Sequence, residues 1–342
     1  MRQGERKTGK VTIFDIAKAA GVSYSTVSRV ATNFDRVNPE TRQRVLAVMQ
    51  EMGYVANQHA RSLVHGKSRI IGLLVHALGN QYIGEVIRGI DEELFEVGYD
   101  LMLYTTHRQR GKEAQYVSTI TGGLADGLLL IVPMGQESYL DALRKVNFPH
   151  VLVDVDGVSS GSPSVGTTNR KGAYDATHYL LELNHRRIGF ISDVMSLNTA
   201  VERLKGYQLA LEEYGVAFDP ALVQEDDFVR SEARALTDKL LALPEPPTAI
   251  LASSDPAALN VMDSVREHNL EIPGDISVIG FDDTLLASIV NPKLTTVREP
   301  LYQMGKTAAR MLLEQLQDID QPPQYIQLET ELVVRESCCP PR

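Results

Sequence analysis

The sequence predicts an α/β protein: a small all-α helix-turn-helix head followed by a two-lobed body with parallel sheets. Three observations lead to this fold class. Short helical patterns occupy the first 56 residues, apolar runs alternate with amphipathic helical patterns beyond residue 68, and 342 residues exceed the size at which one core keeps growing. The many strand-like runs would strain a single sheet, so we expect two similar lobes.

The first two helical patterns of the head meet at a short turn. Apolar residues recur between Ile13 and Ala20 at helical spacing and predict one buried face. Gly21 supplies the permissive backbone that a tight turn needs. Ser23 is a suitable N-cap for the next helix, whose valines lie on its buried side. This second helix therefore exposes short polar side chains and one cation, namely Tyr24, Ser25, Thr26, Ser28 and Arg29.

A third helix is expected to complete the head. Asn38 suits its N-cap and Pro39 its first position, and Gly53 marks its end. Its apolar residues, Val45, Val48, Met49 and Met52, can close a small core.

The charge of the head differs from that of the whole chain. Residues 1–67 contain eleven Lys and Arg against five Asp and Glu, whereas the chain has a formal net charge of −10. A basic head on an acidic chain favours a local contact with nucleic acid. A helix rich in short polar residues with one arginine also suits the major groove of double-stranded DNA. A three-helix bundle without a ligand is the alternative.

The body shows the alternation of strands and helices that is typical of α/β folds. Continuous apolar strands separated by amphipathic helices indicate parallel sheets covered on both faces. We expect the chain to cross between lobes in the Ser/Gly-rich stretch Gly157–Gly166 and to return in Asn291–Glu299. The expected strands are Ile70–Val75, Asp100–Tyr104, Gly127–Val132, His150–Val155, Arg187–Ser192, Ala249–Ser253 and Ile276–Phe281.

Long ordered motifs in both parts resemble the lactose/galactose repressor (LacI/GalR) family of bacterial transcription regulators. In the head they are V-T-I-F-D-I-A-K-A-A-G-V-S-Y-S-T-V-S-R-V, N-P-E-T-R-Q-R-V and M-G-Y-V-A-N-Q-H-A-R-S-L. In the body they are R-I-I-G-L-L-V, A-D-G-L-L-L-I, V-L-V-D and D-I-S-V-I-G-F-D-D. The resemblance covers nearly the full length. It implies a body like that of periplasmic sugar-binding proteins, with a ligand in the cleft between the lobes.

The resemblance also implies domain limits. We expect a DNA-binding domain at residues 1–56, a hinge helix and linker at 57–68, and an effector-binding and dimerisation domain at 69–342. Lobe 1 would comprise about 69–166 and 298–326, and lobe 2 about 167–297 and 327–342.

The family's DNA contacts transfer to named positions of this chain. Tyr24, Ser25 and Arg29 match the base-reading positions, and a guanidinium can span the O6 and N7 of guanine. The hinge helix matches Asn57–Val64 and orders only when paired on DNA, because eight isolated residues do not hold a helix. Ala56 stands where relatives often have Pro. Phosphate contacts are expected from Thr12, Ser23, Thr26, Ser28 and Asn33, and hinge contacts from Asn57, Ala60 and Leu63, the last as a minor-groove wedge.

Ligands of open α/β sheets bind beyond the carboxyl ends of the strands, so polar residues there are the effector candidates. Arg203 can fork two donors, and carboxylates accept from hydroxyls. Asp255 has the alternative of capping the next helix, and Phe228 of being core. Two departures from the family leave the effector open: Ser254 stands where relatives have Asn, and Thr168 where they have Asp. The candidates are His76, Tyr82, Asp154, Arg203, Phe228, Ser254, Asp255 and Asp282.

Enzymatic and membrane functions are not expected. The chain lacks a Gly-x-Gly-x-x-Gly loop after a strand, a Walker-type loop and His pairs at metal-ligand spacing, so we expect no catalysis, no cofactor and no metal. No stretch approaches ~18 apolar residues and no apolar signal core opens the chain, which predicts a cytoplasmic protein, nucleoid-associated when on DNA. Cys338 and Cys339 are adjacent, so no loop-closing disulfide is expected.

The function expected from these patterns is sequence-specific repression. A homodimer would bind a pseudo-palindromic operator of carbohydrate-utilisation genes and respond to a sugar-like effector. Alternatives are a regulator corepressed by a purine or phosphosugar and, in a different class, a pure small-molecule binding protein. The C-terminus shows no Leu heptad, which favours a dimer over a tetramer. The sequence leaves the effector, its sign and the operator open.

Overall fold

The computed structural model describes residues 11–31, 37–54, 67–79, 81–107, 109, 111–133, 137–155, 161–226 and 232–342. The chain divides into two compact units, Met1–Arg69 and Ile70–Arg342, which we call the head and the body. No helix among the described residues is long and apolar enough to cross a membrane.

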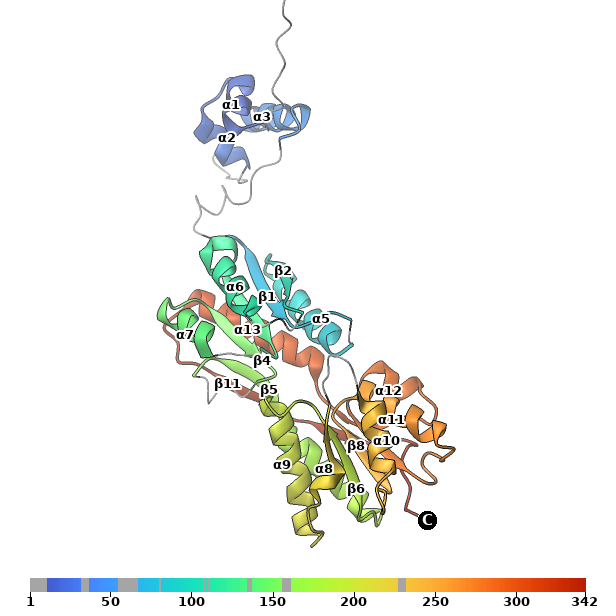
Figure 1. Cartoon of the computed structure of the whole chain (residues 1–342). Helices are drawn as coiled ribbons and strands as arrows, with labels where there is room; N and C mark the ends of the chain where they lie inside the picture. Colours follow the sequence, from blue (N-terminus) through green and yellow to red (C-terminus); the bar gives the residue numbers. More distant parts are fainter. Residues whose placement is uncertain are drawn as a thin grey trace, which may run out of the picture. The chain divides into compact units, whose positions relative to one another are not determined.

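The head is a small three-helix unit (Figure 1). Its helices are α1 (Ile13–Ala20), α2 (Tyr24–Ala31) and α3 (Pro39–Glu51), with Asn38 as the N-cap of α3 as predicted. Gly21 adopts the left-handed backbone, φ 66°, that the turn after α1 requires. The core that holds the helices together consists of Ile16, Ala17, Ala20, Val27, Val30 and Val45.

The body contains two six-stranded sheets in its described part, each the centre of one lobe. Lobe 1 has the strand order β11-β5-β4-β3-β1-β2, and its strands are β1 (Ile70–Val75), β2 (Asp100–Thr105), β3 (Gly127–Ile131), β4 (His150–Val153), β5 (Ser164–Thr167) and β11 (Tyr325–Leu328). Lobe 2 has the order β12-β10-β9-β8-β6-β7, and its strands are β6 (Ile188–Ser192), β7 (Val223–Glu225), β8 (Ala249–Ala252), β9 (Ser277–Asp282), β10 (Thr295–Arg298) and β12 (Glu331–Val333). All neighbours are parallel except β10 and β12.

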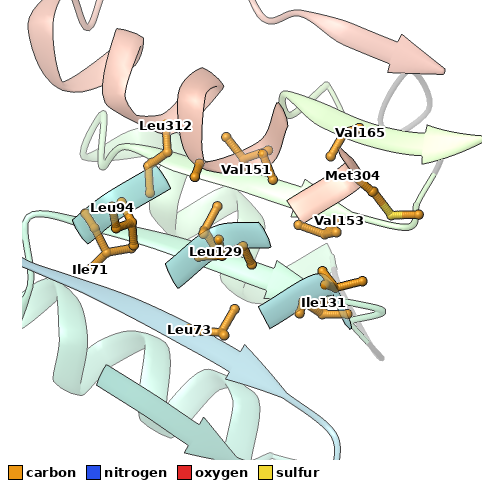
Figure 2. Packing of buried hydrophobic residues seen from close by; sticks show 14 of the residues in the cluster. Ile71, Leu73, Leu94, Leu129, Ile131, Val151, Val153, Val165, Met304 and Leu312 are labelled. Carbon is orange, nitrogen blue, oxygen red and sulfur yellow. The ribbon is translucent and has the colours of Figure 1, made fainter. Parts of the chain in front are cut away.

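Helices cover both faces of each sheet, because successive strand side chains point to opposite faces. In lobe 1, α5 (Gln81–Glu96) and α13 (Leu301–Gln317) pack on one face, and α6 (Lys112–Thr119) and α7 (Glu137–Lys145) on the other. Figure 2 shows the first of these cores, where Leu129 and Val151 of the sheet meet Leu94 and Leu312 of the helices. In lobe 2, α8 (Asn169–Glu182) and α9 (Asn198–Glu213) cover one face, and α10 (Ala233–Leu241) and α11 (Asp255–Glu267) the other; the short η1 (Ile120–Leu124), η2 (Pro220–Leu222) and α12 (Leu285–Ile289) complete the body.

In each lobe, two paired helices approach so closely that a glycine of one helix lies against the backbone of the other. A Cβ atom on Gly89 of α5 would lie 2.1 Å from the carbonyl oxygen of Tyr302, and one on Gly305 of α13 would lie 2.1 Å from that of Val86. In lobe 2, a Cβ atom on Gly206 of α9 would lie 2.1 Å from the carbonyl oxygen of Arg170 in α8. Any side chain at these positions would therefore force the paired helices apart.

The chain crosses between the lobes at positions that differ from those predicted from the sequence. The expected crossover segments, Gly157–Gly166 and Asn291–Glu299, overlap β5 and β10, which lie inside the two sheets. The chain crosses after each of them, and a third time between β11 and β12. A hydrogen bond joins two of the crossing segments: the backbone N–H of Thr330 donates to the Thr168 hydroxyl at 2.9 Å. Short strands rich in Ser and Thr lack the apolar run that marks a buried strand, which is why the pattern missed them.

Candidate functional site

The exposed face of α2 presents the polar side chains that the sequence predicted. Tyr24 is 57% exposed, and Ser25 and Arg29 are also exposed, while Val27 and Val30 anchor the opposite face in the core. Ser23 caps the helix by accepting a hydrogen bond from the Thr26 backbone N–H at 3.2 Å. The helix therefore holds its outward side chains on a rigid, capped support.

The start of α1 adds two features to this surface. The Thr12 hydroxyl caps α1: it accepts from the Asp15 backbone N–H at 3.4 Å and donates to Asp15 Oδ2 at 2.6 Å. This pairing lowers the pKa of the Asp15 carboxyl. Phe14 is 67% exposed and its ring stacks on that of Tyr24, with centroids 5.7 Å apart. Sequence reasoning missed Phe14, although an aromatic residue off the apolar face of a helix is a usable signal.

Several candidate residues lie outside the described part of the chain. They are Asn33, Asn57, Ala60 and Leu63 of the head and linker, and Phe228 of the body. Their predicted contacts with DNA or effector stay predictions.

The body contains a cavity of about 480 Å³ between its lobes, at the carboxyl ends of the strands. Six of the effector candidates line it: His76, Tyr82, Asp154, Arg203, Ser254 and Asp282. The other lining residues are Gly79, Gln81, Val132, Asp193, Leu197, Thr199, Ser253, Pro256, Thr284 and Leu286.

Three strands end at the cavity in left-handed backbone. Val132 follows β3 with φ 44°, Asp154 follows β4 with φ 58°, and Asp282 ends β9 with φ 102°. Non-glycine residues rarely adopt this conformation, and a fold retains it where the position of a side chain matters. All three residues line the cavity, and two of them are carboxylic acids among the predicted effector contacts.

Arg203, on α9, is the cation among the described residues that line this cavity, and it is firmly held. Its Nε donates to Asn169 Oδ1 at 2.6 Å, Nη1 to the Ser253 carbonyl at 2.5 Å, and Nη2 to Glu299 Oε2 at 3.2 Å. The guanidinium carbon lies 3.7 Å from the centroid of the Phe281 ring. A guanidinium has five N–H donors. Two of them are therefore left without an acceptor among the described residues and can serve a ligand.

The acceptors of the cavity are buried carboxylates. Asp154 is 6% exposed, and its Oδ1 has no hydrogen-bond partner among the described residues. Burial, together with the charge of Glu299, raises the pKa of Asp154 to about 6. Burial and Glu299 also raise the pKa of Asp282. The Tyr82 hydroxyl and Ser253 Oγ are buried here and equally lack a partner among the described residues.

Asp255 does not line the cavity, in contrast to our expectation. Its carboxylate accepts from the Thr284 backbone N–H at 2.6 Å, from the Thr284 hydroxyl at 2.9 Å and from the Thr296 hydroxyl at 2.6 Å. It thus joins the start of α11 to β10 and the segment after β9. Ser254, its neighbour, caps α11 through the Ala257 N–H at 3.3 Å and does line the cavity. In the described part of the chain, no three His, Cys, Asp or Glu side chains are grouped to hold a metal ion.

Comparisons with known proteins find matches along most of the chain. Residues 12–57 match a model of bacterial regulatory proteins, lacI family, and residues 177–338 match a periplasmic binding protein-like domain. The HTH-type transcriptional regulator RegA of Clostridium saccharobutylicum is 34% identical over 329 residues, 95% of this chain and 98% of its own. The HTH-type transcriptional regulator DegA of Bacillus subtilis (strain 168) is 34% identical over 334 residues, 97% of this chain and 99% of its own.

Solved structures agree with these matches. A lac repressor dimer bound to operator and the anti-inducer ONPF is similar with a TM-score of 0.84 and 27% identity, over 97% of this chain and 100% of that one. A complex of the transcriptional regulator CelR with cellobiose is similar with a TM-score of 0.74 and 29% identity, over 96% and 99%.

Proposed function

The chain belongs to the LacI family of bacterial regulatory proteins, and on this premise we propose that it represses carbohydrate-utilisation genes under the control of a neutral, sugar-like effector. Like its relatives it is a DNA-binding transcriptional regulator and not an enzyme. The head is the DNA-binding part, and the cavity between the lobes is the proposed effector site.

One observation carries the proposal for the effector: the cavity offers donors and acceptors for hydroxyl groups in a confined volume. Arg203, with two N–H groups left over, and Asp154, whose Oδ1 has no hydrogen-bond partner among the described residues, line a space of about 480 Å³. Such a volume lies within the range of small-ligand sites. Because a hydroxyl group both donates and accepts, a polyol satisfies these buried groups without bringing in a charge.

A phosphorylated effector fits this cavity less well. Its phosphate would meet the buried carboxyl groups of Asp154 and Asp282, which line the cavity, and an arginine that is already paired with Glu299. Like charges in a buried site repel each other strongly, since the surroundings screen them poorly. We therefore rank a neutral sugar above a phosphosugar, and we keep a phosphosugar or a purine corepressor as the alternative outcome of the experiment below.

We further propose that a homodimer binds a pseudo-palindromic operator in the cytoplasm, in association with the nucleoid. Exposed Tyr24, Ser25 and Arg29 are the proposed base readers, and the segment 57–64 the proposed hinge. The similar lac repressor dimer bound to operator supports this arrangement. Effector binding would change the relation of the lobes and thereby the affinity for operator, as linkage requires.

The experiment begins with selection of an operator from genomic fragments by the purified full chain. Fluorescence anisotropy then gives the operator Kd with neutral mono- and disaccharides, phosphosugars and purines in turn. A neutral sugar should weaken operator binding about tenfold or more, within the usual range of allosteric coupling. The double variant Arg203→Gln/Glu299→Gln, which leaves no unpaired buried charge, should abolish that response and leave operator affinity unchanged. A response to purines or phosphosugars alone would contradict the proposed effector class.

A further inference from the structure

Glu299 is a buried carboxylate that our sequence reasoning did not single out. It lies at the crossing between β10 and α13, and its side chain has no exposed surface. Its Oε1 accepts a hydrogen bond from the Thr167 hydroxyl, and its Oε2 accepts one from Arg203 Nη2 at 3.2 Å. A carboxylate buried this completely persists only when it is paired, so its partner Arg203 explains its charge.

The same pairing changes what Arg203 can bind. The Arg203 side chain is only 6% exposed, and one full negative charge already stands against its guanidinium. Asn169 holds the guanidinium from a second side: it accepts from Arg203 Nε at 2.6 Å and donates to Thr167 Oγ1 at 3.1 Å. Thr167, Asn169 and Glu299 thus form a fixed cradle behind the guanidinium. Its two remaining N–H donors keep their direction, but its charge is balanced.

We propose that Glu299 is a specificity-determining residue: it balances the charge of Arg203 inside the cavity, so that the guanidinium serves neutral hydroxyl groups and does not hold an anion. The identity of the neutral ligand rests on the function proposed above, whereas the exclusion of anions is a property of the Glu299–Arg203 pair alone.

The charges around the cavity support this role. An arginine without a carboxylate partner is a favoured site for phosphate and carboxylate groups. Here Glu299 occupies the position of such an anion, and the buried carboxyl groups of Asp154 and Asp282, which line the same cavity, offer an anion no further cation. An anion that entered would have to displace Glu299 or remain beside these carboxyl groups. A neutral polyol meets neither obstacle.

The test removes the charge of Glu299 and keeps its shape. Inorganic sulfate is the probe, and the melting temperature of the full chain is measured in sodium sulfate and in sodium chloride of equal ionic strength. Sulfate stabilises many proteins by exclusion from their surface. Glu93→Gln therefore serves as the matched control, because Glu93 also pairs with an arginine, Arg310 at 2.8 Å, but this arginine does not line the cavity.

In Glu299→Gln we expect the sulfate effect to exceed that in wild type and in Glu93→Gln by ~2 °C or more, since a ligand that binds only the native state raises its stability. The excess should vanish in the double variant Glu299→Gln/Arg203→Gln, which lacks the guanidinium. An equal sulfate effect in Glu299→Gln and wild type would overturn the proposal. So would an excess that persists without Arg203.

A second measurement needs no variant and covers the case in which Glu299→Gln does not fold. The wild-type chain is melted with glucose, galactose and ribose and with a phosphate ester of each. No ester should stabilise the protein more than its parent sugar, and an ester that does so would overturn the proposal. If no neutral sugar in a wider panel stabilises the protein while the sulfate result holds, the proposed effector class fails and the role of Glu299 stands.

Discussion

The head and the cavity of the body place their polar side chains in opposite environments. On α2 the residues proposed to read DNA are exposed, and the cap that supports the helix is local, because Ser23 and Thr26 lie three positions apart. In the cavity Arg203 and Glu299 are buried, and they are 96 positions apart in sequence. The head can therefore lose a functional side chain without losing its fold, whereas the cavity cannot. The following predictions test this difference.

The largest effect is expected for Arg203→Met. The variant leaves the Glu299 carboxylate buried without a counter-charge, which costs about 3–5 kcal/mol for a buried pair. Urea unfolding of the purified chain should show this loss. The double variant Arg203→Met/Glu299→Met should recover most of it, because no unpaired charge remains. If Arg203→Met unfolds at the same urea concentration as wild type, the pair does not hold the cavity together.

A gain of stability is expected for Asp154→Asn at neutral pH. The pKa of Asp154 is raised to about 6 from an ordinary 3.8, so the folded state binds the proton more tightly than the unfolded state does. Wild-type stability therefore falls as the pH rises between these values, and Asn avoids that cost. We expect a gain on the order of 1–3 kcal/mol at pH 7.5, from ~1.4 kcal/mol per pKa unit with a discount for coupled neighbours.

The pH dependence provides the control for this variant. The difference should shrink as the pH falls from about 6 to 3.8, because Asp154 is protonated first in the folded state and then in the unfolded state, and thermal melts of variant and wild type should converge below pH 3.8. A difference that stays constant from pH 7.5 to pH 5 would show that packing, and not charge, separates the two proteins.

In the head, Arg29→Ala should affect function without affecting stability. A bidentate contact between an arginine and a base is worth ~1–3 kcal/mol, or roughly 5- to 150-fold in operator affinity. Because Arg29 is exposed, the melting temperature should stay within experimental error of wild type. Arg44→Ala removes an exposed cation from α3 and is the matched control for charge in the anisotropy titration. Equal losses of operator affinity in the two variants would show that Arg29 contributes only through its charge and does not read a base.

The smallest effect is expected for Ser23→Ala. The substitution removes the acceptor of the Thr26 N–H and should destabilise the head by ~1 kcal/mol, the usual value of an N-cap. Amide hydrogen exchange can follow the head and the body separately, and only amides of the head should exchange faster. Ser23→Asp, which restores a capping acceptor, should return exchange to the wild-type rate. Faster exchange in the body would contradict the independence of the two units.

The sequence predicted structure well where contacts are local, as in the head, and less well where partners are distant in sequence, as around the cavity. Aliphatic strands such as Ile70–Val75 were placed correctly, because a buried parallel strand needs a continuous apolar run. The strands β5, β7, β10, β11 and β12 were missed, since strands of three or four residues that include polar side chains lack that signal. The cap at Ser23 was predicted because its partner is local.

Within the cavity, sequence identified residues at strand ends but not the pairs between them. Glu299 meets Thr167 from 132 positions away, and no local pattern reports such a contact. Asp255 shows the converse, because its place after a strand suggested a ligand contact and its threonine partners gave it a structural role. The chemical type of a residue and its position at the end of a strand thus predict where the residue lies. They do not predict which partner forms hydrogen bonds with it.

The glycine contacts between paired helices have a consequence for genetics. Every missense change at Gly89, Gly206 or Gly305 adds at least one carbon where a carbonyl oxygen lies 2.1 Å away. A screen of random alleles for lost regulation should therefore recover these three codons alongside those of the DNA-facing and cavity residues. Gly206 follows Arg203 by less than one helical turn, so its alleles should mimic the loss of effector response. The positions of such alleles in the sequence would then identify the paired helices as well as the residues of the ligand site.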